Sequence, residues 1–127
     1  MIKSILIVDD SLLTRSFMRR TMQLAGVGVE SLHEASNGAE ALEVLQQHPV
    51  HLVLADLHMP KVNGIELVHR MRADSHLSGI PVLIVSADPD TEELDRMRAE
   101  HVDGYLGKPF TPEELMAALH PIFGEHQ

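Results

Sequence analysis

Five polar residues of the sequence carry functional groups that could act together on a metal ion or a phosphoryl group. Each follows a short run of residues that is typical of a strand: Asp9, Asp10, Asp56, Ser86 and Lys108. Ligands of open parallel sheets bind at the carboxyl ends of the strands. We therefore expect these residues to meet on one rim of a sheet, although they are far apart in the sequence.

The chemistry of such a rim is restricted by its charge. Two carboxylates about 4 Å apart repel each other by about 4 kcal/mol at an effective dielectric constant near 20, so three of them need a cation. Carboxylate oxygens suit Mg²⁺, and Mn²⁺ would also be accepted. A carboxylate can attack phosphorus to form an aspartyl phosphate. The metal ion, Lys108 and the Ser86 hydroxyl would then stabilise the charge on the phosphoryl oxygens.

Three runs that are apolar throughout, residues 5–8, 52–55 and 82–85, predict strands that are buried on both faces, as in a parallel sheet. The mixed run 29–35 and the short run 104–106 predict edge strands. We expect an α/β fold with a five-stranded parallel sheet in the order 2-1-3-4-5, doubly wound with five helices. Residues 1–127 are expected to form one domain.

Helical patterns lie between the predicted strands. In the first helix, Leu13, Phe17 and Leu24 recur at helical spacing with Met18, Met22 and Ala25 beside them, and this pattern predicts the face that packs on the core. Helix starts are predicted at Asn37 with Glu40, at Asn63-Gly64, at Thr91, and at the capping box Thr111-Pro112-Glu113-Glu114. Pro121 should end or kink the last helix near Leu119.

The composition excludes several classes of function. The chain of 127 residues has no cysteine, so disulfides, thiolate metal sites and cysteine nucleophiles are excluded. Its formal net charge is -9, and we expect no direct binding to nucleic acid, which requires a basic surface. We see no signal-peptide pattern and no apolar run that could span a bilayer. A cytoplasmic protein without membrane association is expected.

The motifs resemble those of the receiver domain of response regulators, the CheY-like family. The resemblance extends from about Lys3 to Ile122 and rests on four segments: Leu6-Ile7-Val8-Asp9-Asp10-Ser11, Asp56-Leu57-His58-Met59-Pro60 with Gly64, Val85-Ser86-Ala87, and Tyr105-Leu106-Gly107-Lys108-Pro109-Phe110. The family fold has the strand order given above.

The resemblance implies a role for each matching residue. Asp56 corresponds to the phosphoacceptor, and Lys108 to the lysine that contacts the phosphoryl group. Asp9 and Asp10 correspond to the acid pair that holds Mg²⁺ together with Asp56 and the backbone carbonyl of His58. Ser86 and Tyr105 correspond to the switch hydroxyl and the switch aromatic. The Lys108–Pro109 peptide bond is expected to be cis.

The resemblance also implies partners. A sensor histidine kinase or a phosphotransfer protein would supply the phosphoryl group, and a protein output target would bind the face formed by the fourth helix, the fifth strand and the fifth helix. The chain would catalyse only its own phosphorylation and autodephosphorylation. The fifth helix lacks the arginine-rich face of receivers that dimerise, so we expect a monomer or a weak dimer.

Two features depart from the family pattern or adjust it. Glu100-His101-Val102 replaces the usual Ala-Gly-Ala, so His101 is expected in left-handed geometry. His58 and Asp88 lie two residues beyond the acceptor and the switch hydroxyl. By family analogy they border the approach of water to the phosphoryl group, where His58 could hydrogen-bond Asp88 and set the phosphoryl lifetime.

Three alternatives use parts of the same evidence. An aspartyl-phosphate phosphatase of the haloacid dehalogenase type needs a second aspartate at position 58, where this chain has histidine. A flavodoxin-like binding protein needs a Ser/Thr/Gly-rich loop after the first strand, where Asp9 and Asp10 would repel a phosphate. A receiver that acts as an unphosphorylated interaction module would not need an intact acidic site.

Overall fold

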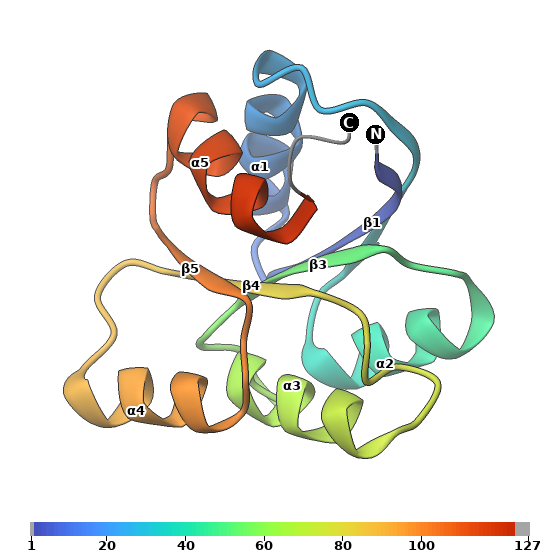
Figure 1. Cartoon of the computed structure of the whole chain (residues 1–127), viewed down its shortest axis with the longest axis vertical. Coiled ribbons are helices and arrows are strands. Elements are labelled where there is room, and N and C mark those ends of the chain that lie inside the picture. The colour runs from blue at the N-terminus through green and yellow to red at the C-terminus, as the bar shows by residue number, and fades with distance from the viewer. Residues whose placement is uncertain (1, 124–127) are drawn as a thin grey trace.

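A computed structural model describes residues 2–123, with side chains from Ser4 onward. Five parallel strands form one sheet in the order β2-β1-β3-β4-β5, as predicted, and five helices alternate with them (Figure 1). The elements are β1 (Ile2–Val8), α1 (Leu12–Leu24), β2 (Val29–Ala35), α2 (Gly38–Gln47), β3 (Leu52–Asp56), α3 (Gly64–Ala73), β4 (Val82–Ser86), α4 (Thr91–Ala99), β5 (Gly104–Gly107) and α5 (Pro112–Phe123).

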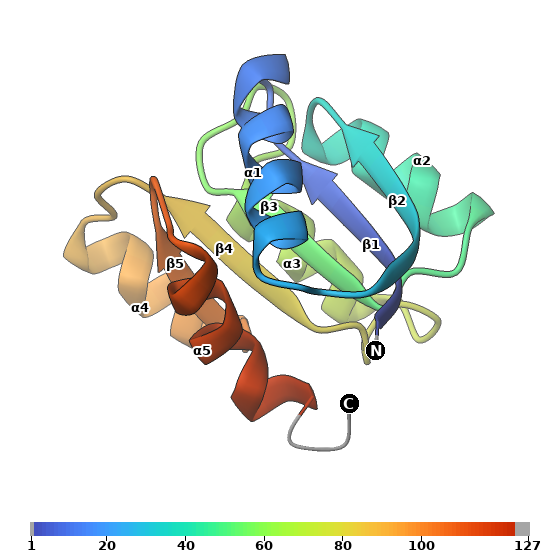
Figure 2. The same cartoon turned by 90° about the horizontal axis from the view of Figure 1, so that it is seen from above.

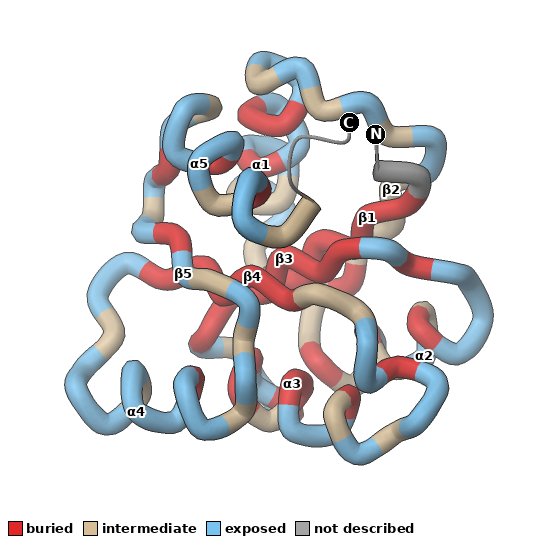
Figure 3. The backbone as a smooth tube through the Cα atoms, viewed as in Figure 1, coloured by how far each residue is buried: buried red, intermediate tan, exposed pale blue. Residues whose placement is uncertain are grey.

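The sheet is covered on both faces, which explains why its central strands are apolar throughout. Helices α1 and α5 lie on one face, and α2, α3 and α4 lie on the other (Figures 1 and 2). Successive residues of a strand point to opposite faces, so Ile5 and Ile7 pack towards α1 and α5, while Leu6 and Val8 pack towards α2 and α3. Figure 3 shows the buried residues concentrated in β1, β3 and β4.

The two weaker strands lie at the edges of the sheet, as predicted. β2 is only partly buried until Ala35, and β5 has one buried residue, Leu106. The parallel register aligns Asp56 with Val85 and Ser86 with Gly107. This alignment brings the ends of β3, β4 and β5 to one rim.

The predicted core face of α1 is right for its methionines and wrong for Leu13, Phe17 and Leu24. Leu13, Phe17 and Leu24 are 82%, 46% and 63% exposed, whereas Met18 and Met22 are buried. Each residue of a helix is rotated by about 100° from the one before it, so Phe17 lies well away from the direction of Met18. Packing between the sheet and α5 selects the methionine stripe, and the leucine–phenylalanine stripe faces outwards.

The expected end of α5 near Leu119 is also wrong, because the helix continues through Pro121 to Phe123. Only the last turn lies beyond Leu119, so the backbone N–H that Pro121 lacks costs the helix little stability. Leu119 is buried, and Ile122 and Phe123 pack against the same apolar cluster, which stabilises the last turn.

The predicted helix starts are largely confirmed. Asn37 and Asn63 cap α2 and α3, and Thr111 forms a reciprocal capping box with Glu114. α4 begins at Thr91, as predicted, and a capping box between Asp90 and Glu93 starts it. No helix in residues 2–123 is both long and apolar enough to cross a membrane.

Candidate functional site

Three carboxylates meet at the carboxyl ends of β1 and β3. Asp9 and Asp10 follow β1, and Asp56 is the last residue of β3. Asp9 and Asp56 are 1% and 6% exposed, whereas Asp10 is exposed, so the cluster opens to solvent on one side. One oxygen from each of the three lies within 4.8 Å of the others. This is the clustering that the sequence predicts.

Lys108 joins this cluster from the loop after the edge strand β5. Its Nζ lies 2.9 Å from Asp9 Oδ2 and 3.1 Å from Asp56 Oδ1. The Lys108 backbone N–H donates to the carbonyl of Ser86 at 3.0 Å, which fixes the loop after β5 to the end of β4. The Lys108–Pro109 peptide bond is cis, as expected.

Burial and charge oppose each other at the two central groups. Burial raises the pKa of the Asp56 carboxyl above its ordinary value, and the charge of Asp9 adds to this, while Lys108 lowers it in part. Burial lowers the pKa of Lys108, but the hydrogen bond and the charges of Asp9 and Asp56 outweigh it and leave this pKa raised. The lysine therefore stays protonated at neutral pH, beside a carboxylate whose charge is unfavourable.

Ser86 and Tyr105 lie next to the same rim. Ser86 is the last residue of β4 and is 2% exposed. The Tyr105 hydroxyl donates to the Ser86 backbone carbonyl at 3.1 Å, although the tyrosine as a whole is 39% exposed. The pair that the resemblance implies is thus in contact through the end of β4.

The loop after β3 passes very close to Asp56. A side chain at Gly64 would collide with the Asp56 carbonyl oxygen, so glycine permits this approach. The Gly64 N–H donates to the Leu57 carbonyl at 3.1 Å. Close packing of this loop places His58 beside the acceptor, where the His58 backbone N–H acts to lower the pKa of Asp56.

Arg15 is a site residue that the sequence analysis missed. Its guanidinium donates to the Asp9 carbonyl at 2.5 Å and to Glu34 Oε1 at 2.7 Å. It thereby ties the end of β1 to α1 and to β2. No motif marks Arg15, because its role depends on α1 crossing the end of the sheet.

The expected contact between His58 and Asp88 is wrong. The His58 ring lies with Nε2 2.7 Å from Glu93 Oε2 of α4, and Asp88 is exposed. The Glu93 pKa is lowered by the hydrogen bonds from the Asp90 backbone N–H and from His58. His101 has a φ of 62°, which confirms the expected left-handed geometry.

An apolar groove adjoins the acidic rim on the side of α1. Its volume is about 370 Å³, and it is lined by Leu13, Thr14, Phe17, Met18, Lys108, Pro109 and Phe110. Phe17 and Phe110 contact each other edge to face, with ring centroids 6.4 Å apart. Lys108 therefore lines the groove with its stem while its ammonium group binds Asp9 and Asp56.

Comparisons with known proteins agree with this geometry. The family model of the response regulator receiver domain matches residues 5–120. The chain is 37% identical over 121 residues to chemotaxis protein CheY-3 of Vibrio cholerae, and the aligned region covers 94% of this chain and 90% of that protein. It is 33% identical over 121 residues to chemotaxis protein CheY1 of Helicobacter pylori, with 94% and 96% covered.

Solved structures show the same fold. Chemotaxis protein CheY4 of Vibrio cholerae superposes with a TM-score of 0.84 at 30% identity, covering 97% of this chain and 100% of that chain. The chain belongs to the response regulator receiver domain family, in its CheY-like form. Members of this family are signalling proteins of two-component systems rather than conventional enzymes.

Proposed function

We propose that the chain, as a single receiver domain over residues 1–127, accepts a phosphoryl group on Asp56. The observation that carries this proposal is the position of Lys108, whose ammonium group contacts both Asp9 and Asp56. An ordinary helix cap would not require two buried carboxylates and a lysine from three different strand ends. A nucleophilic carboxylate beside a fixed cation suits phosphoryl transfer.

Mg²⁺ fits the donors of this rim, and Mn²⁺ has similar requirements. Asp9, Asp10 and Asp56 offer oxygen ligands, and the carbonyl of His58 would complete the set of protein ligands. The bound ion would neutralise repulsion between the carboxylates and the incoming phosphoryl oxygens. Because Asp10 is exposed, the ion would keep part of its water shell.

The residues of the chain would perform the transfer in one displacement. An Asp56 carboxylate oxygen forms a bond to phosphorus while the bond from phosphorus to the nitrogen of a donor phosphohistidine breaks, and the electron pair of that bond stays on the imidazole. Lys108 and the Ser86 hydroxyl donate hydrogen bonds to the phosphoryl oxygens. Lys108 keeps its proton throughout, as its raised pKa requires. Autodephosphorylation would be attack of water on the same phosphorus.

The donor would be a sensor histidine kinase or a phosphotransfer protein, and we propose that it docks on the groove beside α1. Lys108 lines this groove and also contacts Asp56, so an apolar surface seated here would bring its histidine to the acceptor. The output signal would leave by the face formed by α4, β5 and α5. There, Ser86 would turn towards the phosphoryl group and Tyr105 would follow it.

Labelling with acetyl phosphate and Mg²⁺ tests the acceptor. Intact-mass measurement should show one added phosphoryl group on the wild type and none on Asp56→Asn. Asp88→Asn is the matched control, because it removes the same charge from an exposed position and should label normally. Full labelling of Asp56→Asn would refute the assignment.

A further inference from the structure

His58 connects the acidic rim to α4 through two different groups. Its backbone N–H faces the Asp56 carboxylate and acts to lower the pKa of that group. Its ring Nε2 lies 2.7 Å from Glu93 Oε2. One residue of the loop after β3 therefore links the proposed acceptor to the first turn of α4.

Glu93 uses its two oxygens for two different contacts. Oε1 accepts the Asp90 backbone N–H at 3.0 Å as part of the capping box, and Oε2 contacts His58. Its side chain is 23% exposed, while that of His58 is 64% exposed. The His58 ring is thereby bonded to a glutamate whose position the helix start already fixes.

The start of α4 has little else to hold it. None of its first four residues, Thr91 to Leu94, is buried, and Leu94 is 38% exposed. The only buried residue of the helix is Met97, in its second half. An amphipathic helix normally relies on an apolar stripe, so this first turn depends on polar contacts instead.

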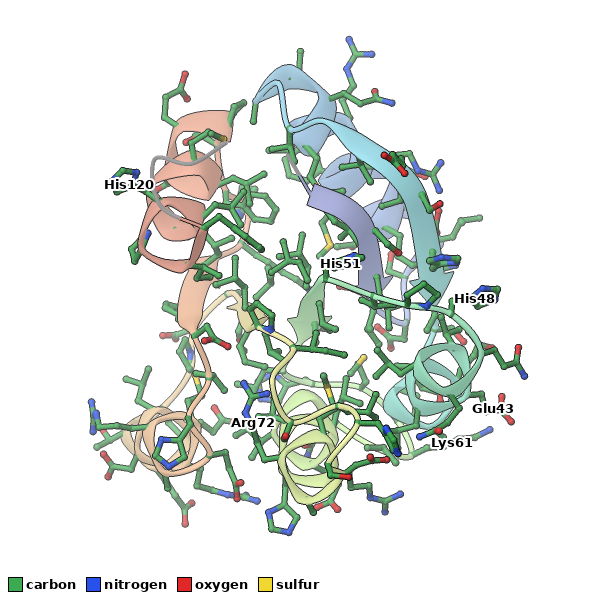
Figure 4. All side chains as sticks on the ribbon, turned by 45° about the vertical axis from the view of Figure 1, so that its right-hand side comes forward. Glu43, His48, His51, Lys61, Arg72 and His120 are labelled. Atoms are coloured by element: carbon green, nitrogen blue, oxygen red, sulfur yellow. The ribbon has the colours of Figure 1, made fainter. Side chains whose placement is uncertain are left out.

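The other end of α4 is held firmly. Arg72, which lies between the α3 and α4 ribbons in Figure 4, donates to the carbonyl of His101 and to Asp103 Oδ2, each at 3.1 Å. His69 of α3 contacts Glu100 at 2.9 Å. Because its last turn is fixed and its first turn is loosely packed, α4 can pivot about its last turn, and its first turn then moves.

We propose that the His58–Glu93 contact restrains the start of α4 in the unphosphorylated state, with Glu93 as the positioning residue and His58 as its link to Asp56. The inference rests on the proposed function of Asp56. A phosphoryl group on Asp56 adds anionic oxygens that compete with the carboxylate for the His58 N–H. The His58 backbone then shifts towards the phosphoryl group and draws its ring away from Glu93, which releases the restraint on α4.

This restraint has a consequence for binding of a phosphoryl mimic. If the contact must break on activation, it disfavours the activated state, and its removal should favour that state. Beryllofluoride with Mg²⁺ is the probe, and its dissociation constant can be measured by calorimetry. Exposed ion pairs contribute little, so Glu93→Ala and His58→Ala should each tighten binding by only about two- to fivefold.

The variants form a double-mutant cycle with a matched control. The double variant His58→Ala/Glu93→Ala should bind no more tightly than either single variant, because both remove one contact. Glu92→Ala removes an exposed glutamate from the same turn and keeps both the capping box and the Glu93 contact with His58, so its affinity should equal that of the wild type. Additive effects of the two substitutions, weaker binding, or an equal effect of Glu92→Ala would overturn the inference.

A second measurement separates this inference from the proposed function. In the metal-free protein, Glu93→Ala should shift the amide resonance of His58 in the NMR spectrum, and Glu92→Ala should leave it in place. An unshifted His58 amide in Glu93→Ala would refute the positioning role whether or not the mimic binds. A wild type that does not bind beryllofluoride, with the His58 amide shifted as expected, would refute the function of Asp56 instead.

Discussion

Neutralising Asp56 should make the metal-free protein more stable. Its carboxylate is buried close to Asp9 and Asp10, and Lys108 is its only nearby positive partner in the part of the chain that the structure describes. The raised pKa of Asp56 also indicates that the folded state disfavours the charged form of this carboxyl. Asp56→Asn removes the charge and keeps the size of the side chain.

The magnitude follows from the distances. At 4.8 Å, each of the two carboxylate repulsions is about 3.5 kcal/mol at an effective dielectric constant of 20. The attraction to Lys108 at 3.1 Å is about 5 kcal/mol on the same scale. Solvent screens the repulsion from the exposed Asp10, so the charge effects nearly cancel, and relief of desolvation, the largest cause of the raised Asp56 pKa, decides the sign. We expect a net gain of about 2 kcal/mol. For a domain of this size, that gain raises the melting temperature by about 6 °C.

Urea unfolding in EDTA, followed by circular dichroism, measures the change. Glu43→Gln is the control, because Glu43 is an exposed residue of α2 with the same charge, and Figure 4 shows its side chain on the outer side of that helix. The control should leave stability almost unchanged. Mg²⁺ should then stabilise the wild type by about 1.4 kcal/mol at ten times its dissociation constant, and Asp56→Asn by much less.

Two results would refute this reasoning. If Asp56→Asn is no more stable than the wild type in EDTA, while Glu43→Gln is unchanged, the carboxylates are not in electrostatic conflict. If Mg²⁺ stabilises Asp56→Asn as much as the wild type, Asp56 does not face the ion. Either result would remove the physical basis of the proposed metal site.

Three further predictions concern other parts of the molecule. Leu13→Ser should slow transfer from a purified phosphodonor protein without slowing labelling by acetyl phosphate, whereas Leu24→Ser, which is exposed on α1 but outside the groove, should slow neither. Burial and the stacked His48 lower the pKa of His33 below 6.5, so the folded chain binds fewer protons than the unfolded chain just below that pH. Stability should therefore fall as pH drops through this window, and unfolding of His33→Gln should show a smaller dependence on pH. His58→Ala should shorten the phosphoryl lifetime, because it removes a side chain that Glu93 holds beside Asp56. The lifetime is measured as decay of the phosphorylated protein after the donor is removed, and Asp88→Ala should change it less. A longer lifetime in His58→Ala would show that the histidine assists hydrolysis.

The rim residues could be predicted because the backbone alone determines where they lie. A residue at the carboxyl end of a parallel strand stands on the same rim as the ends of its neighbours, whatever the side chains do. Asp9, Asp56 and Ser86 each follow or end a run of β-branched and aliphatic residues, so their positions required only the strand assignments and the strand order. The clustering of the Asp9, Asp10 and Asp56 carboxylates within 4.8 Å then follows.

The partners of surface side chains could not be predicted in this way. His58 contacts Glu93 rather than Asp88 because the capping box turns the Glu93 carboxylate towards the loop after β3. Both candidates are acidic residues in the segment after β4, and their sequence positions do not distinguish them. The choice depends on the direction of the first turn of α4, which is a tertiary feature.

The misassigned face of α1 shows how a functional surface can resemble a core in the sequence. Leu13 and Phe17 are spaced as core residues would be, yet they are exposed beside the groove that Lys108 lines. Periodicity reports that a face is apolar, and it cannot report whether the covering surface belongs to the same chain. Met18 and Met22 satisfy the core with the adjacent stripe, so α1 has a second apolar surface that the fold does not use. A helix with two apolar stripes next to a reactive rim is suited to bind a partner that must reach the rim.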